Sequence, residues 1–198
     1  MASKSSYTLA FFAHAHNLAE VTRAVEIARV LSKKEAEITF FTHGGPHENI
    51  INEGGFPLIT LQPIITQEKH ESLIGIEQGR KFHPPFKAGE LSAYVEHEVA
   101  ELRKLQPKAV YFGMNLPCAI SARVLRLPLI EVLPAPVMKT YFEHGLGTYP
   151  ESHEKFLFRF LPHKLKDRLF NRFMLHFRIG LGAFNQVGRR YGLRPFQS

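Results

Sequence analysis

Histidine and glutamate side chains gather in one polar turn near the start of the chain. The run Tyr7–Phe12 is rich in β-formers, and His14, His16 and Glu20 follow it. An imidazole or a carboxylate placed there can act as a general base that takes a proton from a hydroxyl group. Because alternate residues of an extended chain share a face, His14 and His16 can point into one site. The ordinary roles stay open as well: polar rim residues for the histidines, and for Glu20 a helix start that favours a negative charge.

The histidines also raise the question of a metal site. The chain has 11 His, and His43 and His47 follow the second apolar run, so four imidazoles would meet at one sheet edge and could bind Zn²⁺. The sequence has no H-E-x-x-H pattern, no pair of cysteines and no nearby Asp cluster, and we expect no metal. Its single cysteine, Cys118, excludes an intramolecular disulfide and fits a reducing compartment. A buried apolar role is commoner for such a thiol than a nucleophilic one.

Nucleotide-binding motifs are absent from the sequence. Neither G-x-G-x-x-G nor G-x-x-x-x-G-K-[ST] occurs, so the chain lacks the glycine-rich turns that cradle the phosphates of a dinucleotide or of ATP. No recognised nucleic-acid-binding module is present either. We expect no cofactor and no nucleic-acid partner for this chain by itself.

The elements that hold the polar turn alternate between strand and helix. A second strand, Ile38–Thr42, follows an amphipathic helix whose apolar face is Val21, Ala24, Val25, Ala28 and Leu31. Such a βαβ unit implies a parallel sheet, and ligands gather beyond the carboxyl ends of parallel strands. The strongest later helix is Leu91–Leu105, in which we place Glu and Lys opposite the apolar face. Strands are expected at residues 7–13, 37–42, 57–61, 108–113 and 128–133.

This alternation predicts an α/β fold, a single Rossmann-like three-layer α/β/α domain over residues 1–198 with a parallel sheet of five or more strands. Residues 1–6 are expected to be flexible. Residues 63–90 combine helical apolar spacing with Gly and Pro, and a long insertion of this kind is usually functional. Residues 139–152 have the composition of a loop, and residues 153–191 look helical.

The net charge of +7 lies entirely in the last quarter of the chain. Residues 151–198 hold ten Lys and Arg against three acidic residues, whereas residues 1–150 are balanced. Phe and Leu interleave with these cations at near-helical spacing, which is typical of basic amphipathic helices on anionic membrane surfaces. In the other interpretation the aromatic rings pack on the sheet and the cations face water. No stretch reaches the roughly 20 apolar residues of a membrane span, and the N-terminus lacks the apolar core of a signal peptide, so we expect a cytoplasmic chain, with membrane association open.

Several short motifs, in order along most of the chain, resemble the two-domain GT-B glycosyltransferases of the UDP-glycosyltransferase and family 28 group. That family reads G-H-V-T-R or G-H-x-x-P after its first strand, then A-L-A-x-x-L, then G-H-x-V-x-F-x-T, E-x-G-F-x-x, x-x-x-P-D-x-V and x-A-x-x-L-G-I-P. The corresponding stretches here are Ala19–Arg23, Ile27–Leu31, Ala36–Thr42, Ile51–Leu58, Lys104–Val110 and Ser121–Ile130.

The resemblance implies that the chain is the N-terminal, acceptor-binding half of such an enzyme, with residues 153–191 leading towards a donor domain that is missing. The nucleotide-sugar donor is then expected only with a second domain, and the chain alone should be inactive. The family places a His base at the position of Glu20, so the expected catalytic residues are Glu20, His14 and His16. The family's orienting Asp is absent from the turn that contains Asn115.

The acceptor is expected to be a small molecule or a lipid-linked one. Residues 63–90 and 139–160 would shape its pocket, and the predicted acceptor-binding residues are Asn17, Asn115, His83 and Tyr141. Three architectures stay open: a truncated enzyme, a split enzyme whose donor domain is a separate chain, and a non-catalytic Rossmann-like binding subunit. A peripheral membrane protein is a further alternative.

Overall fold

The computed structural model describes residues 7–77, 80–81, 83–132, 135–150, 160–176 and 180–196. Contacts divide the chain into two compact units. The first contains Met1–Glu131 and Ile179–Phe196, and the second contains Val132–Arg178 and Gln197–Ser198. Whether they behave as one domain stays a prediction. The expected flexibility of residues 1–6 concerns residues outside those described, as do the parts of the expected C-terminal helices at 153–159 and 177–179.

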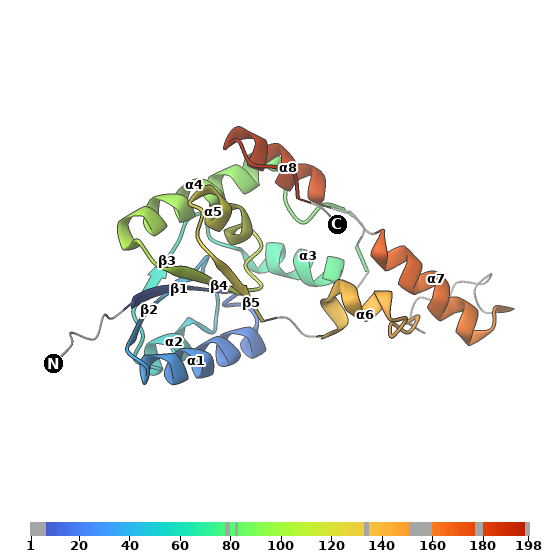
Figure 1. The fold of residues 1–198 in the computed structure, drawn as a ribbon, viewed down its shortest axis with the longest axis horizontal. Coiled ribbons are helices and arrows are strands. Elements are labelled where there is room, and N and C mark those ends of the chain that lie inside the picture. Colours follow the sequence, from blue (N-terminus) through green and yellow to red (C-terminus); the bar gives the residue numbers. More distant parts are fainter. Residues whose placement is uncertain are drawn as a thin grey trace. The chain divides into compact units, whose positions relative to one another are not determined.

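The first unit is built on a five-stranded parallel sheet in the order β3-β2-β1-β4-β5 (Figure 1). Each predicted strand is present within two residues of its expected ends, which confirms the α/β fold with a parallel sheet. In the central pairs Phe11 lies opposite Phe40 on one side and opposite Tyr111 on the other. The strands are β1 (Tyr7–Ala13), β2 (Ala36–Thr42), β3 (Leu58–Thr60), β4 (Ala109–Gly113) and β5 (Leu129–Glu131).

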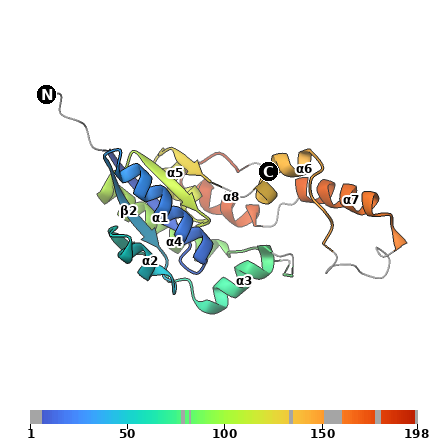
Figure 2. The same cartoon turned by 90° about the horizontal axis from the view of Figure 1, so that it is seen from below.

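Helices cover both faces of this sheet, as a three-layer fold requires (Figures 1 and 2). On one face lie α1 (Leu18–Ser32) and α2 (Glu48–Glu53), and on the other α4 (Ala88–Leu105), α5 (Cys118–Val124) and α8 (Leu181–Arg190). Side chains of a strand alternate between faces, so the ring of Phe11 stacks on Tyr111 at 4.5 Å beneath α1, whereas Phe12 stacks on Phe41 at 5.0 Å. Two apolar cores result, and the sheet is fixed firmly enough to position side chains at its carboxyl edge.

In the described part of residues 63–90 lies α3 (Gln67–Glu77), and residues 88–90 already begin α4. Lys69 anchors α3, because its Nζ donates to the Pro85 carbonyl at 2.6 Å and pairs with Glu90 of α4 at 2.8 Å. The same ammonium lies 4.3 Å from the ring centroid of Phe86. This one cation therefore holds α3 against the segment that leads into α4.

The second unit contains η1 (Ala135–Val137), α6 (Lys139–Glu143) and α7 (His163–Leu175). The expectation of a loop over residues 139–152 is thus wrong for α6. Asn171 holds α7 against the segment that follows α6, since Gly147 N–H donates to its Oδ1 at 2.9 Å and its Nδ2 donates to the Gly147 carbonyl at 2.7 Å. Among the described helices of either unit, none is both long and apolar enough to cross a bilayer.

Candidate functional site

A cavity of about 230 Å³ opens at the carboxyl ends of β1 and β4. Its walls are mainly apolar, with Leu73, Ile74 and Ile76 contributed by α3 and Ile65 and Phe86 by the segments on either side of that helix. The polar residues in its lining are His14, Asn17 and Asn115. Three of the residues predicted from the sequence are therefore brought together, at the sheet edge where ligands of parallel α/β folds bind.

His14 stands directly after β1 and belongs to a cluster of three imidazoles. Its Nε2 lies 3.1 Å from Nδ1 of His70 on α3, and the His70 ring stacks on that of His16 with centroids 4.8 Å apart. His16 Nε2 donates to the Ile65 carbonyl at 2.8 Å, so in a neutral ring its Nδ1 is an acceptor, and this atom is buried without a partner. The part of His70 in this cluster was not predicted, because no sequence motif surrounds it. The only signal was its location in the insertion at residues 63–90, which was expected to be functional.

The surroundings keep the His14 ring neutral. Burial, followed by the nearby His70, His16 and His43, lowers the pKa of His14 to about 4. Burial is also the main cause that lowers the pKa of His70. At neutral pH the hydrogen bond between them is thus one between uncharged rings. If His14 Nε2–H donates to His70, the other nitrogen of His14 carries a lone pair, and no described residue is bonded to it.

These rings are not arranged around a common centre, as metal ligands would be. His16 and His70 lie nearly parallel, at 21° between ring planes, and His16 Nε2 is already used by a backbone carbonyl. Within the described ranges, no group of three His, Cys, Asp or Glu residues has the arrangement needed to hold a metal ion.

Asn115 belongs to the cavity lining, and its side-chain oxygen is buried. Its side chain is only 2% exposed and its Oδ1 has no partner. The preceding residue, Met114, has a φ of +58°, a conformation that is unfavourable for a residue with a side chain. Such strain is usually retained at functional sites. Asn17 also lines the cavity, and its Oδ1 accepts from the backbone N–H groups of Ala19 and Glu20 and so caps α1.

Glu20 lies in the first turn of α1 on the buried side of that helix, and its side chain forms an ion pair with Arg23 at 3.0 Å. It is 4% exposed and does not line the cavity. His83 lies on the surface, 3.2 Å from the Ser72 hydroxyl, and is also outside the cavity lining. Tyr141 is on α6 of the second unit, where its ring contacts Phe142. The catalytic roles of His14, His16 and Glu20 and the acceptor contacts of Asn17, Asn115, His83 and Tyr141 stay predictions.

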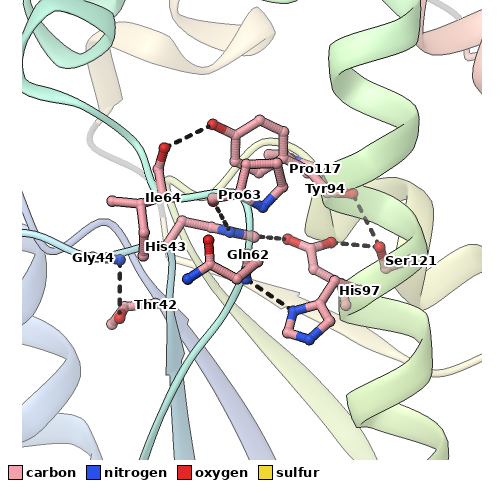
Figure 3. Close-up of polar contacts among 11 residues, drawn as sticks. Thr42, His43, Gly44, Gln62, Pro63, Ile64, Tyr94, His97, Pro117 and Ser121 are labelled. Carbon is pink, nitrogen blue, oxygen red and sulfur yellow. Dashed lines mark hydrogen bonds and ion pairs between the residues drawn. The ribbon is translucent and has the colours of Figure 1, made fainter.

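A second polar group, not predicted from the sequence, lies between the end of β2 and α4 (Figure 3). His43 Nε2 is 3.0 Å from Glu98 Oε1, its Nδ1 donates to the Pro63 carbonyl at 2.9 Å, and the Ser121 hydroxyl donates to Glu98. Burial is the main cause that raises the pKa of Glu98, while the bonds from His43 and Ser121 oppose it. The side chains of His43 and Glu98 are 0% exposed, so no substrate reaches them.

Glu98 corrects the expectation that the Glu residues of α4 face away from the core. Its position was readable from spacing, because Tyr94, Glu98 and Leu102 follow each other at four-residue intervals on the apolar face. A carboxylate on that face indicates a buried partner. The partner itself, His43, comes from a distant strand end and is fixed only by the fold.

Comparison with known proteins supports the architecture. No family model matches the chain, and no curated protein does. Among solved structures the chain is similar to the glycosyltransferase VinC in complex with dTDP (TM-score 0.55, 14% identity) and to CalG4, the calicheamicin glycosyltransferase (TM-score 0.51, 12% identity). The matches cover 96% of this chain but 45% and 44% of those chains. The chain therefore has the Rossmann-like fold of one half of a GT-B glycosyltransferase, as the sequence predicted.

Proposed function

We propose that this chain is the acceptor-binding half of a glycosyltransferase that moves a sugar from a nucleotide sugar to an acceptor hydroxyl. The observation that carries the proposal is His14, a neutral imidazole that lines an apolar cavity at the carboxyl edge of a GT-B-like sheet. The chain spans less than half of the matched structures. In this proposal the nucleotide sugar is bound by a second domain or by a separate chain.

The reaction needs a base that takes the proton of the acceptor hydroxyl. The acceptor oxygen then forms a bond to the anomeric carbon of the sugar, the bond from that carbon to the nucleoside diphosphate breaks, and the proton stays on the base. His14 takes this role in the proposal, with Nε2–H donating to His70 so that the opposite nitrogen is the acceptor. His70 is then a positioning residue, because it fixes the tautomer and orientation of His14 without touching the acceptor.

A pKa of about 4 makes His14 a weak base when the chain is alone. A diphosphate brought close to the ring would raise this pKa, because an anion favours the charged form of an imidazole. The proposal therefore links catalytic competence to the donor: His14 becomes an effective base only when a nucleotide sugar is bound nearby.

Two measurements test the proposal. The isolated chain should neither hydrolyse UDP-glucose and dTDP-glucose nor transfer their sugar, and turnover at the rate of a two-domain enzyme would contradict the missing-half interpretation. An affinity-tagged chain should also purify with a partner that carries the donor site. In that complex His14→Gln should lower the transfer rate by about 10²–10⁴-fold, whereas Glu20→Gln should have little effect. The reverse outcome would make Glu20 the base.

A second candidate function, peripheral membrane binding by a cytoplasmic chain, is favoured by one face of α7. Leu165, Leu169 and Phe173 repeat at four-residue intervals and are 41%, 43% and 53% exposed. The exposed cations Lys164, Arg168 and Arg172 run beside them and also line a groove of about 440 Å³. Adjacent apolar and basic rows suit the surface of an anionic bilayer, where each cation contributes about 1 kcal/mol.

Vesicle sedimentation tests this candidate. The chain should bind vesicles that contain phosphatidylglycerol, bind pure phosphatidylcholine weakly, and dissociate as salt is raised. Arg168→Glu with Arg172→Glu should weaken binding at least tenfold, while the control Lys33→Glu with Lys34→Glu changes it little. Equal binding to both kinds of vesicle, or equal loss in the two variants, would contradict membrane docking by α7 and leave this face to a protein partner.

A further inference from the structure

Helix α3 is attached to the rest of the first unit by two neighbouring residues of different chemistry. Lys69 holds it to α4 through an ion pair with Glu90 at 2.8 Å. The next residue, His70, holds it to the turn after β1, where its ring meets those of His14 and His16. Lysine and glutamate side chains ordinarily keep their charges between about pH 5.5 and pH 8, whereas imidazoles gain theirs in this range. Of the two attachments, the second is therefore the one whose groups change their charge.

The contact at His70 favours uncharged rings. The ring centroids of His14, His16 and His70 lie 4.8–5.8 Å apart, so two charged rings would repel each other strongly. His14 Nε2 lies 3.1 Å from His70 Nδ1, and a hydrogen bond between these atoms needs one nitrogen without a proton. If both rings were protonated, two N–H groups would face each other. Nδ1 of His16 is buried without a partner, so a proton bound there would also have no acceptor.

The groups around the cluster do not offset this preference. Burial is the main cause that lowers the pKa of His14 and of His70. One carboxylate, Glu71 on α3 itself, favours the charged form of His70 but is outweighed. His16 and His70 are half-buried, so protons from solvent reach them. The neighbouring elements oppose charge on His14 or His70 through His16 in the turn after β1, His43 after β2 and His47 before α2.

We propose that His14, His16 and His70 form a pH-sensitive histidine latch, which holds the start of α3 against the turn after β1 at neutral pH and releases it below about pH 6. Protonation of His70 and His16 replaces a hydrogen bond and a ring stack by repulsion between like charges. Lys69 keeps α3 attached to α4, so the helix moves about this point and does not leave the unit. Because α3 supplies part of the wall of the 230 Å³ cavity, its release opens that cavity.

The linkage between proton binding and release sets the size of the effect. The pKa of a released imidazole is near its ordinary value of about 6.5, whereas latched rings stay neutral to lower pH. Acidification therefore favours the released state, because that state binds more protons. For each ring freed in this way, the ratio of released to latched molecules should rise about tenfold between pH 7.5 and pH 5.5.

Spin labels on two helices measure the movement of α3. Glu68→Cys in the first turn of α3 and Val30→Cys on α1 carry the labels, since both positions are exposed and the native Cys118 is buried. Double electron–electron resonance should show a second distance population that is at least about tenfold larger at pH 5.5 than at pH 7.5. A second labelled pair, Val30→Cys with Ala100→Cys on α4, should give the same distance at both pH values, because α1 and α4 stay packed on the sheet.

Variants at His70 assign the movement to the histidine latch. His70→Gln cannot be protonated and should abolish the pH-dependent population. His70→Arg is charged at both pH values and should show this population already at pH 7.5. The matched control is His83→Gln, because His83 also contacts α3, at 3.2 Å from the Ser72 hydroxyl, but lies outside the histidine latch. This control should respond to pH like the parent chain.

In the parent chain, identical distances between residues 30 and 68 at both pH values would overturn the histidine latch, and this measurement needs no substitution within it. A changed distance between residues 30 and 100 would also overturn it, because the chain would then unfold instead of releasing one helix. So would an undiminished pH response in His70→Gln, or a lost response in His83→Gln.

The histidine latch stands or falls separately from the proposed function, because release of α3 needs neither donor nor acceptor. A complete enzyme that is inactivated by His14→Gln but keeps α3 in place at pH 5.5 would exclude only the histidine latch. A complete enzyme indifferent to His14→Gln, in which α3 is released at pH 5.5, would exclude only the catalytic role.

Discussion

His14 and His43 end neighbouring strands of the same sheet, but their surroundings differ in how completely the polar atoms are satisfied. Both ring nitrogens of His43 have partners, and Glu98 is bonded by His43 and Ser121. Beside His14, by contrast, the Nδ1 of His16 and the Oδ1 of Asn115 are buried without partners. A satisfied buried network contributes to one rigid structure, whereas each unsatisfied buried atom requires an explanation, such as strain, an ordered water or a role in the site.

The contrast shows that a buried, titratable cluster is not by itself evidence of chemistry. The His43–Glu98–Ser121 group has the residue types of a catalytic triad, but it is closed and connects β2, α4 and α5 (Figure 3). The His14 group has a less familiar composition, yet it lines a cavity. Access and unmet hydrogen bonds, rather than residue type, make the His14 group the candidate for chemistry and the closed group the candidate for a stabilising role.

The largest expected effect is on the closed group. Glu98→Ala should lower the free energy of unfolding by about 3–5 kcal/mol, because it leaves His43 and Ser121 buried without their partner. Glu101→Ala, three residues along α4 and paired with the exposed Lys104, should cost less than about 1 kcal/mol. Urea denaturation of both variants measures the difference. Equal losses would mean that the closed group does not stabilise the fold in the way argued.

The features set by residues close together in the sequence could be predicted, whereas those that depend on residues far apart in the sequence could not. The strands and the helix faces follow from local apolar periodicity, and the carboxyl edge follows from parallel pairing, so His14, Asn17 and Asn115 were correctly expected at one edge. His70 and Glu98 were not expected to take part, because their partners lie 56 and 55 residues away in sequence. Such pairings appear only when the sheet order and the packing of α3 and α4 are known.

The second effect is the pH dependence of the free energy of unfolding, which has opposite signs for His14 and Glu98. Because the pKa of His14 is lowered to about 4 from 6.5, the unfolded chain binds more protons between these values, and stability rises with pH across this window. His14 alone contributes up to about 3 kcal/mol, which is lost as the pH falls through 6.5 to 4. The raised pKa of Glu98 has the opposite effect. Above the ordinary pKa of a glutamate the folded chain binds more protons than the unfolded chain, so this group lowers stability as the pH rises.

The difference in unfolding free energy between the parent chain and His14→Gln therefore isolates the contribution of His14. Measured from pH 4 to pH 7, this difference should change in favour of the parent chain as the pH rises. Asn115→Leu, which removes no titrating group, should keep the slope of the parent chain. A difference that does not vary with pH would show that His14 titrates normally in the folded chain, and that its burial against His70 is not as described.

A smaller effect of opposite direction is expected at Asn115. Replacing it by Leu removes a buried oxygen without a partner and should raise the free energy of unfolding by about 1 kcal/mol. Asn171→Leu is the matched comparison, because that amide bonds Gly147 through both its atoms, and it should destabilise by about 1–3 kcal/mol. Thermal unfolding of the two variants measures the direction of each stability change. A loss of stability in Asn115→Leu would place Asn115 among the structural residues.

The smallest expected effect comes from two tyrosines of the core, Tyr111 and Tyr94, whose hydroxyl groups differ in their hydrogen bonding. Tyr111 Oη is buried without a partner, and burial raises the pKa of this phenol, whereas the Tyr94 hydroxyl donates to the Ile64 carbonyl at 3.5 Å next to the closed group. Tyr111→Phe should thus raise the free energy of unfolding by about 0.5–1 kcal/mol and Tyr94→Phe should lower it by a similar amount. Paired urea titrations resolve this difference. Equal destabilisation by both substitutions would show that an unmet hydrogen bond does not predict the direction of the stability change, and would remove the basis of the same argument at Asn115.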